Sequence, residues 1–253
     1  GTVNTIRRTK FETTFAGGVG LRGDYSAIFN YAMKVSPVDE SNLNQSLIIV
    51  TPNTIDYGGI TEMWEDGSTI AFCPLSEDTY PYDARGIIQH EAGGHGFGKL
   101  GDEYIYHNGF IEFCCPLDFA TLNHGKSLGW YENLSLTGKM HEVPWAHLIF
   151  DDRYSDVVDI YEGGFMHSRG VFRSEQNSCM NNNISYYNAI SREAIVKRIM
   201  EYAGESYSFE KFVENDKRDV VNSLSRSAER SGVTVRGNQY APRIHKGKPD
   251  ILK

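Results

Sequence analysis

Three observations in the first hundred residues predict an α/β fold for this chain of 253 residues. Apolar residues recur at helical spacing over residues 24–34, and two short apolar runs follow at 46–51 and 68–75. A second helical pattern begins after Asp83. The order helix, strand, strand, helix predicts a twisted mixed sheet with one backing helix and one helix that carries the main motif of the chain.

Each of these elements has a local signal. Asp24 can cap the first helix. The β-branched run 46–51 is bounded by Asn and Pro, which is typical of a buried strand. The run 68–75 follows the turn residues "EDG" and is ended by Pro74. Asp83 can cap the helix "ARGIIQHEAGGH".

The second half of the chain is less regular. Residues 113–145 are rich in Gly, Asn, Ser and Pro without a long period, which is more typical of functional surface than of a linker. An amphipathic helix is predicted over 184–204, where it ends in Gly, and a shorter one near 208–224. A smaller, mostly helical and irregular C-terminal subdomain is therefore expected.

The order of predicted helices and strands indicates a single domain over residues 1–224. Its upper subdomain covers about residues 1–98 and its lower subdomain about 99–224, and a basic tail follows at 225–253. The tail is expected to be solvated or extended. Only 89 residues precede His90, so this chain is expected to be the later part of a longer protein.

Composition excludes several classes of function. A net charge of -8 argues against nucleic acid as the main partner, and no apolar run approaches the roughly 20 residues of a membrane span. The cysteines lack paired CxxC spacing, which argues against a thiolate zinc site. Cys73 and Cys179 are expected to be buried, whereas the adjacent pair Cys114 and Cys115 has no assigned role. A monomer is expected.

The stretch "HEAGGHGFGKLGDEY" carries the chemistry of the chain. His90 and His95 are five residues apart, and on a regular helix of about 100° per residue that spacing turns the second ring some 140° from the first. A π-type bulge absorbs one extra residue, and Gly93 and Gly94 permit it. The sequence therefore predicts a helix that is locally widened at residues 92–94, so that both imidazoles face one metal ion.

The residue types fit a hydrolytic zinc site, which needs three His, Asp or Glu ligands and a nearby carboxylate. His90, His95 and Asp102 can supply the ligands and Glu91 the base. The glycines at 96 and 98 are expected to let the chain leave the helix sharply, so that Asp102 reaches the metal.

Outside the ligand set, Glu103 or Tyr104 could support a histidine or the ligand loop. The alternative is a helix built only for packing. It is disfavoured because each interior glycine costs about 1 kcal/mol in a helix.

These residues resemble the metzincin-like metallopeptidases typified by the bacterial IgA peptidase. Metzincins share HExxHxxGxx(H/D), and Gly98 stands three residues after His95 as in that pattern. The IgA peptidase family places an Asp seven residues after the second histidine, within LxDEY, and "LGDEY" ending at Tyr104 matches it. The resemblance implies Asp102 rather than Glu103 as the third ligand. The chain departs from the pattern by one extra glycine between the histidines.

A second hallmark of these enzymes is a methionine-containing turn beneath the zinc, followed by a helix. "GVFRSEQNSCMNNN", followed by the predicted helix at 184–204, is similar to it and implies Met180 as the methionine. Segments 142–148 and 161–173 also resemble the family. The resemblance covers about residues 48–200, most of the chain.

The resemblance implies a zinc-dependent endopeptidase that acts on a protein or glycoprotein and is exported by a bacterium as a secreted, periplasmic or cell-surface protein. Zinc would polarise the scissile carbonyl and acidify a water, and Glu91 would take the proton of that water and pass it to the leaving amine. His141 and His147 remain alternative ligands or transition-state donors, and His107 is close enough in sequence to line the site.

The sequence also allows two rival functions. One is a non-catalytic protein- or glycan-binding module with a degraded metal site, which the inserted glycine favours and the retained Glu91 disfavours. The other is a purely structural metal, which is disfavoured because structural zinc prefers four protein ligands, often thiolates.

Overall fold

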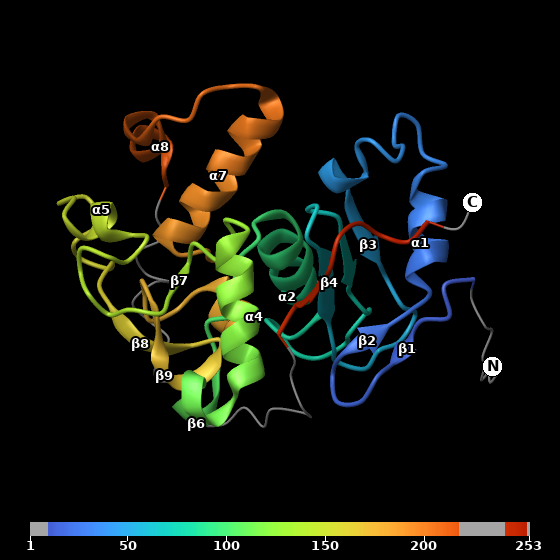
Figure 1. Ribbon diagram of the computed structural model, residues 1–253, viewed down its shortest axis with the longest axis horizontal. Coiled ribbons are helices and arrows are strands. Elements are labelled where there is room, and N and C mark those ends of the chain that lie inside the picture. Colours follow the sequence, from blue (N-terminus) through green and yellow to red (C-terminus); the bar gives the residue numbers. More distant parts are fainter. Residues whose placement is uncertain (1–9, 218–240, 252–253) are drawn as a thin grey trace.

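The structure is a computed structural model, which describes residues 10–217 and 241–251. Figure 1 shows two halves side by side, each with its own sheet. The first half contains the sheet built from residues 47–72 and 243–245, and the second contains the sheet built from residues 105–173. Helix α2 (Ala84–Ile88) lies near the middle of the molecule, between the first sheet and the second half. This mixed α/β architecture agrees with the predicted fold class.

The first sheet has the order β10-β4-β5-β3. Its strands are β3 (Leu47–Val50), β4 (Ile60–Trp64), β5 (Thr69–Phe72) and β10 (Arg243–His245). Strand β4 runs antiparallel to β5, while β3 is parallel to β5 and β10 is parallel to β4. The sheet is therefore mixed, as predicted.

Alternating side chains of the first sheet face two different layers. Ile70 and Phe72 pack in a core with helix α1 (Tyr25–Ala32), whose first turn is capped by Asp24. Ala71, between them, packs with residues of α2 and of the π-helix η2 (Gln89–Phe97). Because successive residues of a strand point to opposite faces, α1 covers one face and the helix that carries the motif covers the other.

The second half holds a sheet with the order β6-β9-β7, and β8 pairs antiparallel with β9 along residues 167–173 of β9. Its strands are β6 (Ile105–Phe110), β7 (Leu134–Ser135), β8 (Tyr161–Gly164) and β9 (Met166–Arg173). Its helices are α3 (Ile111–Cys114), α4 (Pro116–Ser127), α5 (Ala146–Ile149), α6 (Cys179–Asn182), α7 (Ala189–Ala203) and α8 (Phe209–Asn215). The short elements β1 (Thr14–Phe15), β2 (Leu21–Arg22) and η1 (Leu43–Gln45) belong to the first half.

The predictions for the first half hold, with one correction. Both predicted strands and both helices form, and Asp24 and Asp83 accept hydrogen bonds from the first turns of α1 and α2. Strand β3 was expected to be buried, but Leu47 and Ile49 are exposed. These two residues alternate with Ile48 and Val50, which pack in the core with α1, so they point to the opposite face of this edge strand, where no core cluster of the described residues includes them.

The second half departs further from the prediction. The segment expected to be irregular contains helix α4, which begins with Pro116 at a position where proline is well tolerated. The subdomain expected to be mostly helical contains the four-stranded sheet. Helix α7 begins at Ala189, later than predicted, because Asn188 caps it, and it ends at Gly204 with φ of 68° as expected.

The predicted basic tail is only partly described. Residues 225–240 lie outside the described residues, whereas Arg243–His245 form strand β10 of the first sheet instead of a solvated tail. Arg243 and His245 both bind the buried carboxylate of Glu62, at 3.2 and 2.8 Å.

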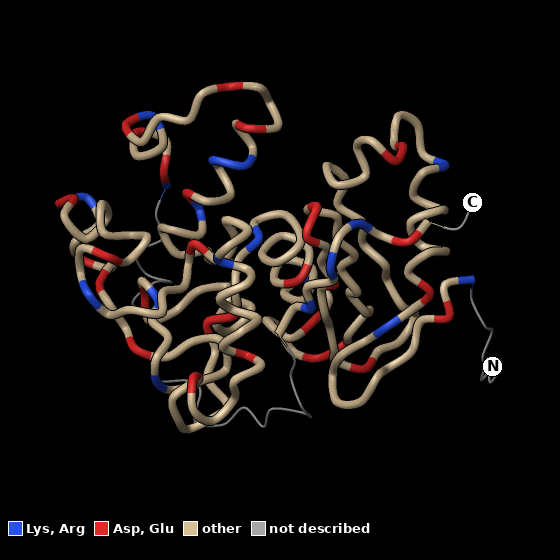
Figure 2. Tube along the Cα trace, viewed as in Figure 1, with Lys and Arg blue, Asp and Glu red and all other residues tan. Residues whose placement is uncertain are grey.

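Charged residues are scattered over both halves in Figure 2, with Lys and Arg interspersed among Asp and Glu. In the described part of the chain, no helix is both long enough and apolar enough to cross a membrane.

Candidate metal centre

The helix that carries both histidines is a π-helix. Helix α2 continues directly into η2, which spans residues 89–97. The amide of Gly98 bonds to the carbonyl of Gly93 at 2.9 Å, which is the five-residue spacing of a π-helix. The predicted widening is confirmed, and it extends beyond residues 92–94. Residues five apart consequently lie about one turn apart, and the two rings come to the same side.

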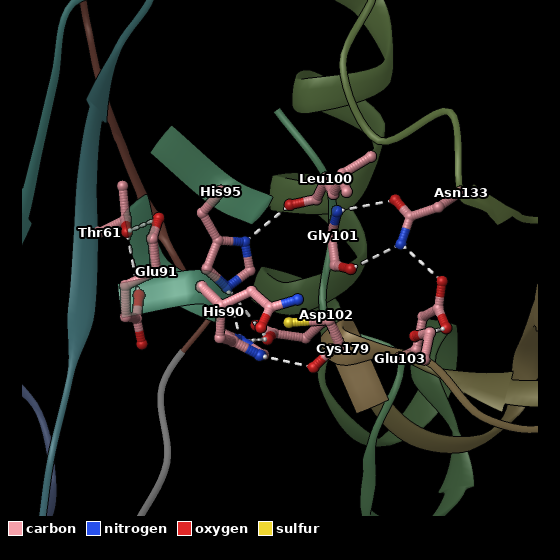
Figure 3. Close-up of polar contacts among 12 residues, drawn as sticks. Thr61, His90, Glu91, His95, Leu100, Gly101, Asp102, Glu103, Asn133 and Cys179 are labelled. Carbon is pink, nitrogen blue, oxygen red and sulfur yellow. Dashed lines mark hydrogen bonds and ion pairs between the residues drawn. The ribbon is translucent and has the colours of Figure 1, made fainter. Parts of the chain in front are cut away.

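His90, His95 and Asp102 meet in a tight triangle (Figure 3). Nε2 of His90 lies 3.1 Å from Nε2 of His95, and Oδ1 of Asp102 lies 3.0 and 3.1 Å from these two nitrogens. All three residues are buried. A tetrahedral zinc ion with bonds of about 2.0–2.1 Å has ligand atoms about 3.3 Å apart. The triangle therefore fits zinc after an outward shift of a few tenths of an ångström.

The outer ring nitrogens fix the tautomer of both histidines. Nδ1 of His90 lies 3.0 Å from the carbonyl of Cys179, and Nδ1 of His95 lies 2.7 Å from the carbonyl of Leu100. A carbonyl only accepts, so each Nδ1 donates and each Nε2 of a neutral ring presents a lone pair. Together with the Asp102 carboxylate, three electron-pair donors then face one point, which is the arrangement of a cation site.

The electrostatics of the triangle favour a positive charge at its centre. Burial lowers the pKa of His90, but the hydrogen bond and charge of Asp102 outweigh it and raise that pKa to about 9. Burial also opposes ionisation of Asp102, yet the two histidines hold the pKa of this carboxyl below its ordinary value. Oδ2 of Asp102 is buried and has no hydrogen-bond partner among the described residues, which leaves a second oxygen for a cation.

Glu91 lies beside the triangle without joining it. Its Oε2 is 2.9 Å from the hydroxyl of Thr61 on β4, and a side chain at Gly59 would come within 2.8 Å of its Oε1. Burial raises the pKa of the Glu91 carboxyl, while the charges of His95 and His90 lower it by less. The site thus holds a positioned carboxylate whose pKa is moved toward neutrality.

The chain leaves the π-helix in a way that the sequence did not indicate. Gly98 has a right-handed conformation, and the left-handed residue is Lys99, with φ of 52°. Gly98 serves a close approach instead, because a Cβ there would lie 2.9 Å from the carbonyl oxygen of Gly94. Lys99 is buried, and its Nζ donates to the carbonyl of Gly67 at 2.8 Å. This turn directs the following residues back toward the histidines.

Asp102 and its neighbour Glu103 point to different partners. Asp102 belongs to the triangle, whereas the buried carboxylate of Glu103 accepts hydrogen bonds from Asn133 at 2.8 Å, Asn188 at 2.7 Å and Ser178 at 2.5 Å. Asn133 also exchanges two bonds of 2.8 Å with the backbone of Gly101 (Figure 3). Glu103 therefore ties the ligand loop to α7 and to the turn before α6.

Met180 and Tyr104 both contact the motif. A Cβ on Gly94 would lie 2.2 Å from Sδ of Met180, so this fully buried methionine packs directly against the π-helix. Its carbonyl accepts the amide of Glu103 at 2.8 Å. The ring of Tyr104 stacks on His90 with 6.2 Å between centroids. A side chain at Gly93 would meet the hydroxyl of Tyr187 at 2.5 Å, so both glycines between the histidines leave room for neighbouring side chains.

The other histidines lie elsewhere. His147 binds Glu193 at 2.7 Å, His141 stacks on Phe150, and the ring of His107 lies 5.2 Å from that of His167. None of these belongs to the triangle of ligand atoms.

The sequence missed several supporting groups, among them Thr61, Asn133, Asn188 and the carbonyls of Cys179 and Leu100. The cap position of Asn188 before an amphipathic helix was the only available signal among them. The chain matches no family model and no curated protein.

Proposed function

We propose that this chain is a zinc-dependent endopeptidase with a metzincin-like catalytic arrangement. The observation that carries the proposal is the convergence of three buried ligand atoms within about 3 Å of each other, with a separate buried carboxylate at their side. A purely structural site would not need Glu91, and the same glutamate argues against the alternative of a non-catalytic binding module.

His90, His95 and Asp102 would hold the ion, and the carbonyls of Cys179 and Leu100 keep both imidazoles in the ligating tautomer. Zinc bound there would supply Lewis acidity for a scissile carbonyl and for a water. Met180 and Glu103 act from outside the ligand set, the first by packing against the helix and the second by anchoring the ligand loop.

Glu91 would carry the proton. Its Oε2 is oriented by Thr61, and its raised pKa brings it closer to the range in which a carboxylate gains and loses a proton near neutral pH. It accepts the proton of the attacking water and returns it to the leaving amine. The family resemblance adds a protein or glycoprotein substrate and export from a bacterial cell to this proposal, in which the chain acts as a monomer.

Hydrolysis of an unfolded protein by the purified chain, with and without a zinc chelator, tests the proposal. We expect cleavage that the chelator abolishes and added zinc restores. Cleavage that continues at the same rate in the chelator would contradict a metal-dependent mechanism. Zinc bound at the triangle, shown by its loss in Asp102→Ala, without any cleavage by the wild-type chain would favour the binding module.

A further inference from the structure

A second cluster of metal-ligating side chains lies away from the triangle, in the second half of the molecule. Sγ of Cys114, Sγ of Cys115 and a ring nitrogen of His167 all lie within 4.8 Å of one another. Cys114 ends α3, Cys115 directly precedes α4, and His167 is on β9. The fold thus adds a histidine from 52 residues downstream to two cysteines that the sequence alone left without a role.

His167 is oriented as a ligand. It is fully buried, and its Nε2 lies 2.9 Å from Oδ2 of Asp118 in the first turn of α4. The carboxylate accepts the Nε2 proton, so Nδ1 of the neutral ring is left with a lone pair. That nitrogen lies 3.3 Å from Sγ of Cys114. A carboxylate on the outer nitrogen is the usual support of a metal-ligating histidine.

We propose that Cys114, Cys115 and His167 form a second zinc site, distinct from the proposed catalytic one. Two thiolates and one imidazole are ligands that zinc prefers. Bonds of about 2.3 Å to sulfur and 2.0–2.1 Å to nitrogen place such ligand atoms roughly 3.5–3.8 Å apart in a tetrahedron. The observed separations reach this geometry by small side-chain movements. The expectation that the cysteines hold no zinc rested on CxxC spacing, which a histidine from a distant strand makes unnecessary.

The second thiol distinguishes this site from a cysteine nucleophile activated by His167. A nucleophile needs one sulfur, one base and one orienting carboxylate, and Cys115 would have no part in it. Cys114 is exposed and Cys115 is half-buried, so the sulfur side is open to solvent and an ion can enter from there. The open side also leaves a fourth position for water or another ligand.

Cobalt(II) substitution of the reduced full chain separates the two sites. The triangle contains no sulfur, so thiolate-to-cobalt charge-transfer absorption reports only on the cysteine cluster. We expect this absorption in the wild-type chain and in Asp102→Ala, and we expect its loss when Cys114 and Cys115 are both replaced by Ser. The double variant should also bind one zinc fewer per chain. His124→Ala is the matched control, because His124 lies on the same helix but pairs with Glu65.

Asp118→Asn tests the positioning of His167. An amide in place of the carboxylate should weaken cobalt binding at the cysteine cluster by roughly 10–100-fold and leave the sulfur-free site unchanged. Both cysteines are at least partly exposed, so serine is tolerated there without loss of the fold, which thermal unfolding checks.

Three outcomes would overturn the proposal. They are the absence of thiolate absorption in the reduced wild-type chain, an equal zinc content in the wild type and the double serine variant, and free-thiol counts showing that the pair stays oxidised under conditions where the triangle binds metal. None of them bears on the proposed peptidase activity, which is assigned to the sulfur-free triangle and Glu91 and is measured as cleavage.

Discussion

Two segments meet at the candidate centre, and they contribute in different ways. The helical segment 84–97 supplies side chains, namely two histidines and Glu91. The turn segment 174–183 supplies no ligand side chain. It contributes the carbonyl of Cys179 to one histidine and packs Met180 against the helix.

This difference shows which parts of such a site can be recognised from the sequence alone. The chemistry of segment 84–97 depends on residue type, so histidine, glutamate and glycine at fixed spacing reveal it. The main contribution of segment 174–183 is a backbone oxygen, which every residue possesses. Support by backbone atoms becomes visible only when the fold brings the two segments together.

Replacing Glu91 by Gln should produce the largest functional effect. The amide keeps the shape and the contact with Thr61 but cannot accept the proton of the attacking water. We expect turnover to fall by about a hundred- to ten-thousand-fold, while zinc content and thermal stability stay near those of the wild type. Steady-state cleavage of an unfolded protein, together with metal analysis, measures both. Equal cleavage rates for the wild type and the variant would show that Glu91 is not the catalytic base and that the catalyst does not lie in segment 84–97.

Asp102→Ala and Glu103→Gln should separate a ligand from a supporting residue. The alanine variant loses one corner of the triangle and should lose its zinc there. Glu103→Gln disturbs only the bonds to Asn133, Asn188 and Ser178, and it should lower zinc affinity or activity by no more than about 10–100-fold. Competition with a chromophoric chelator ranks the two affinities, and the reverse order would make Glu103 the ligand.

The sequence predicted the first half of the fold and the ligand set better than the rest, for physical reasons. Local caps and apolar periods set α1, α2 and β5, and glycines at 93 and 94 indicated the widened helix. Strand β4 gave no clear pattern because it is buried on both faces and includes Glu62, whose partners Tyr25, Arg243 and His245 lie far away in the sequence.

Helix α4 was missed for the opposite reason. Only Leu122 and Gly125 are buried along it, so it lacks the apolar stripe that reveals a surface helix. The role of Asn133 could not be predicted either, since its partners Gly101 and Glu103 are set by tertiary structure. Position 99 shows the same limit: the sharp exit from the helix was expected from the glycines at 96 and 98, but the residue that takes the left-handed conformation there is Lys99.

Glu175 offers a test of the turn segment through pH. Burial raises the pKa of this carboxyl to about 7, even though Tyr186 and the amide of Ala189 donate hydrogen bonds to it. The folded chain therefore holds the proton more tightly than the unfolded chain does. The stability that the bound proton of Glu175 contributes is fully present below about pH 4.5 and is lost as the pH rises through about 7.

Replacing Glu175 by Gln removes this titration. We expect the variant to be more stable than the wild type at pH 8, by on the order of 2–3 kcal/mol, and nearly equal to it at pH 4.5. Urea unfolding at both pH values measures the difference. A variant that loses the same stability at both values would show that the two hydrogen bonds, and not the buried charge, govern this position.

The contact between Gly94 and Met180 tests whether the two segments act as one unit. A methyl group on Gly94 would overlap Sδ of Met180, which is fully buried and has little room to move. Gly94→Ala should therefore lower the free energy of unfolding by about 1–3 kcal/mol in the wild-type background and by much less when Met180 is already Ala.

Gly96→Ala is the matched control on the same helix, because its new methyl group would meet the exposed Leu47 instead. A double-mutant cycle by urea unfolding should give a coupling of about 1–2 kcal/mol for Gly94 with Met180 and almost none for Gly96. Equal coupling energies for both glycines would mean that Met180 interacts with the helix as a whole and not specifically through Gly94. A coupling energy of zero would mean that Met180 does not support the motif through this contact.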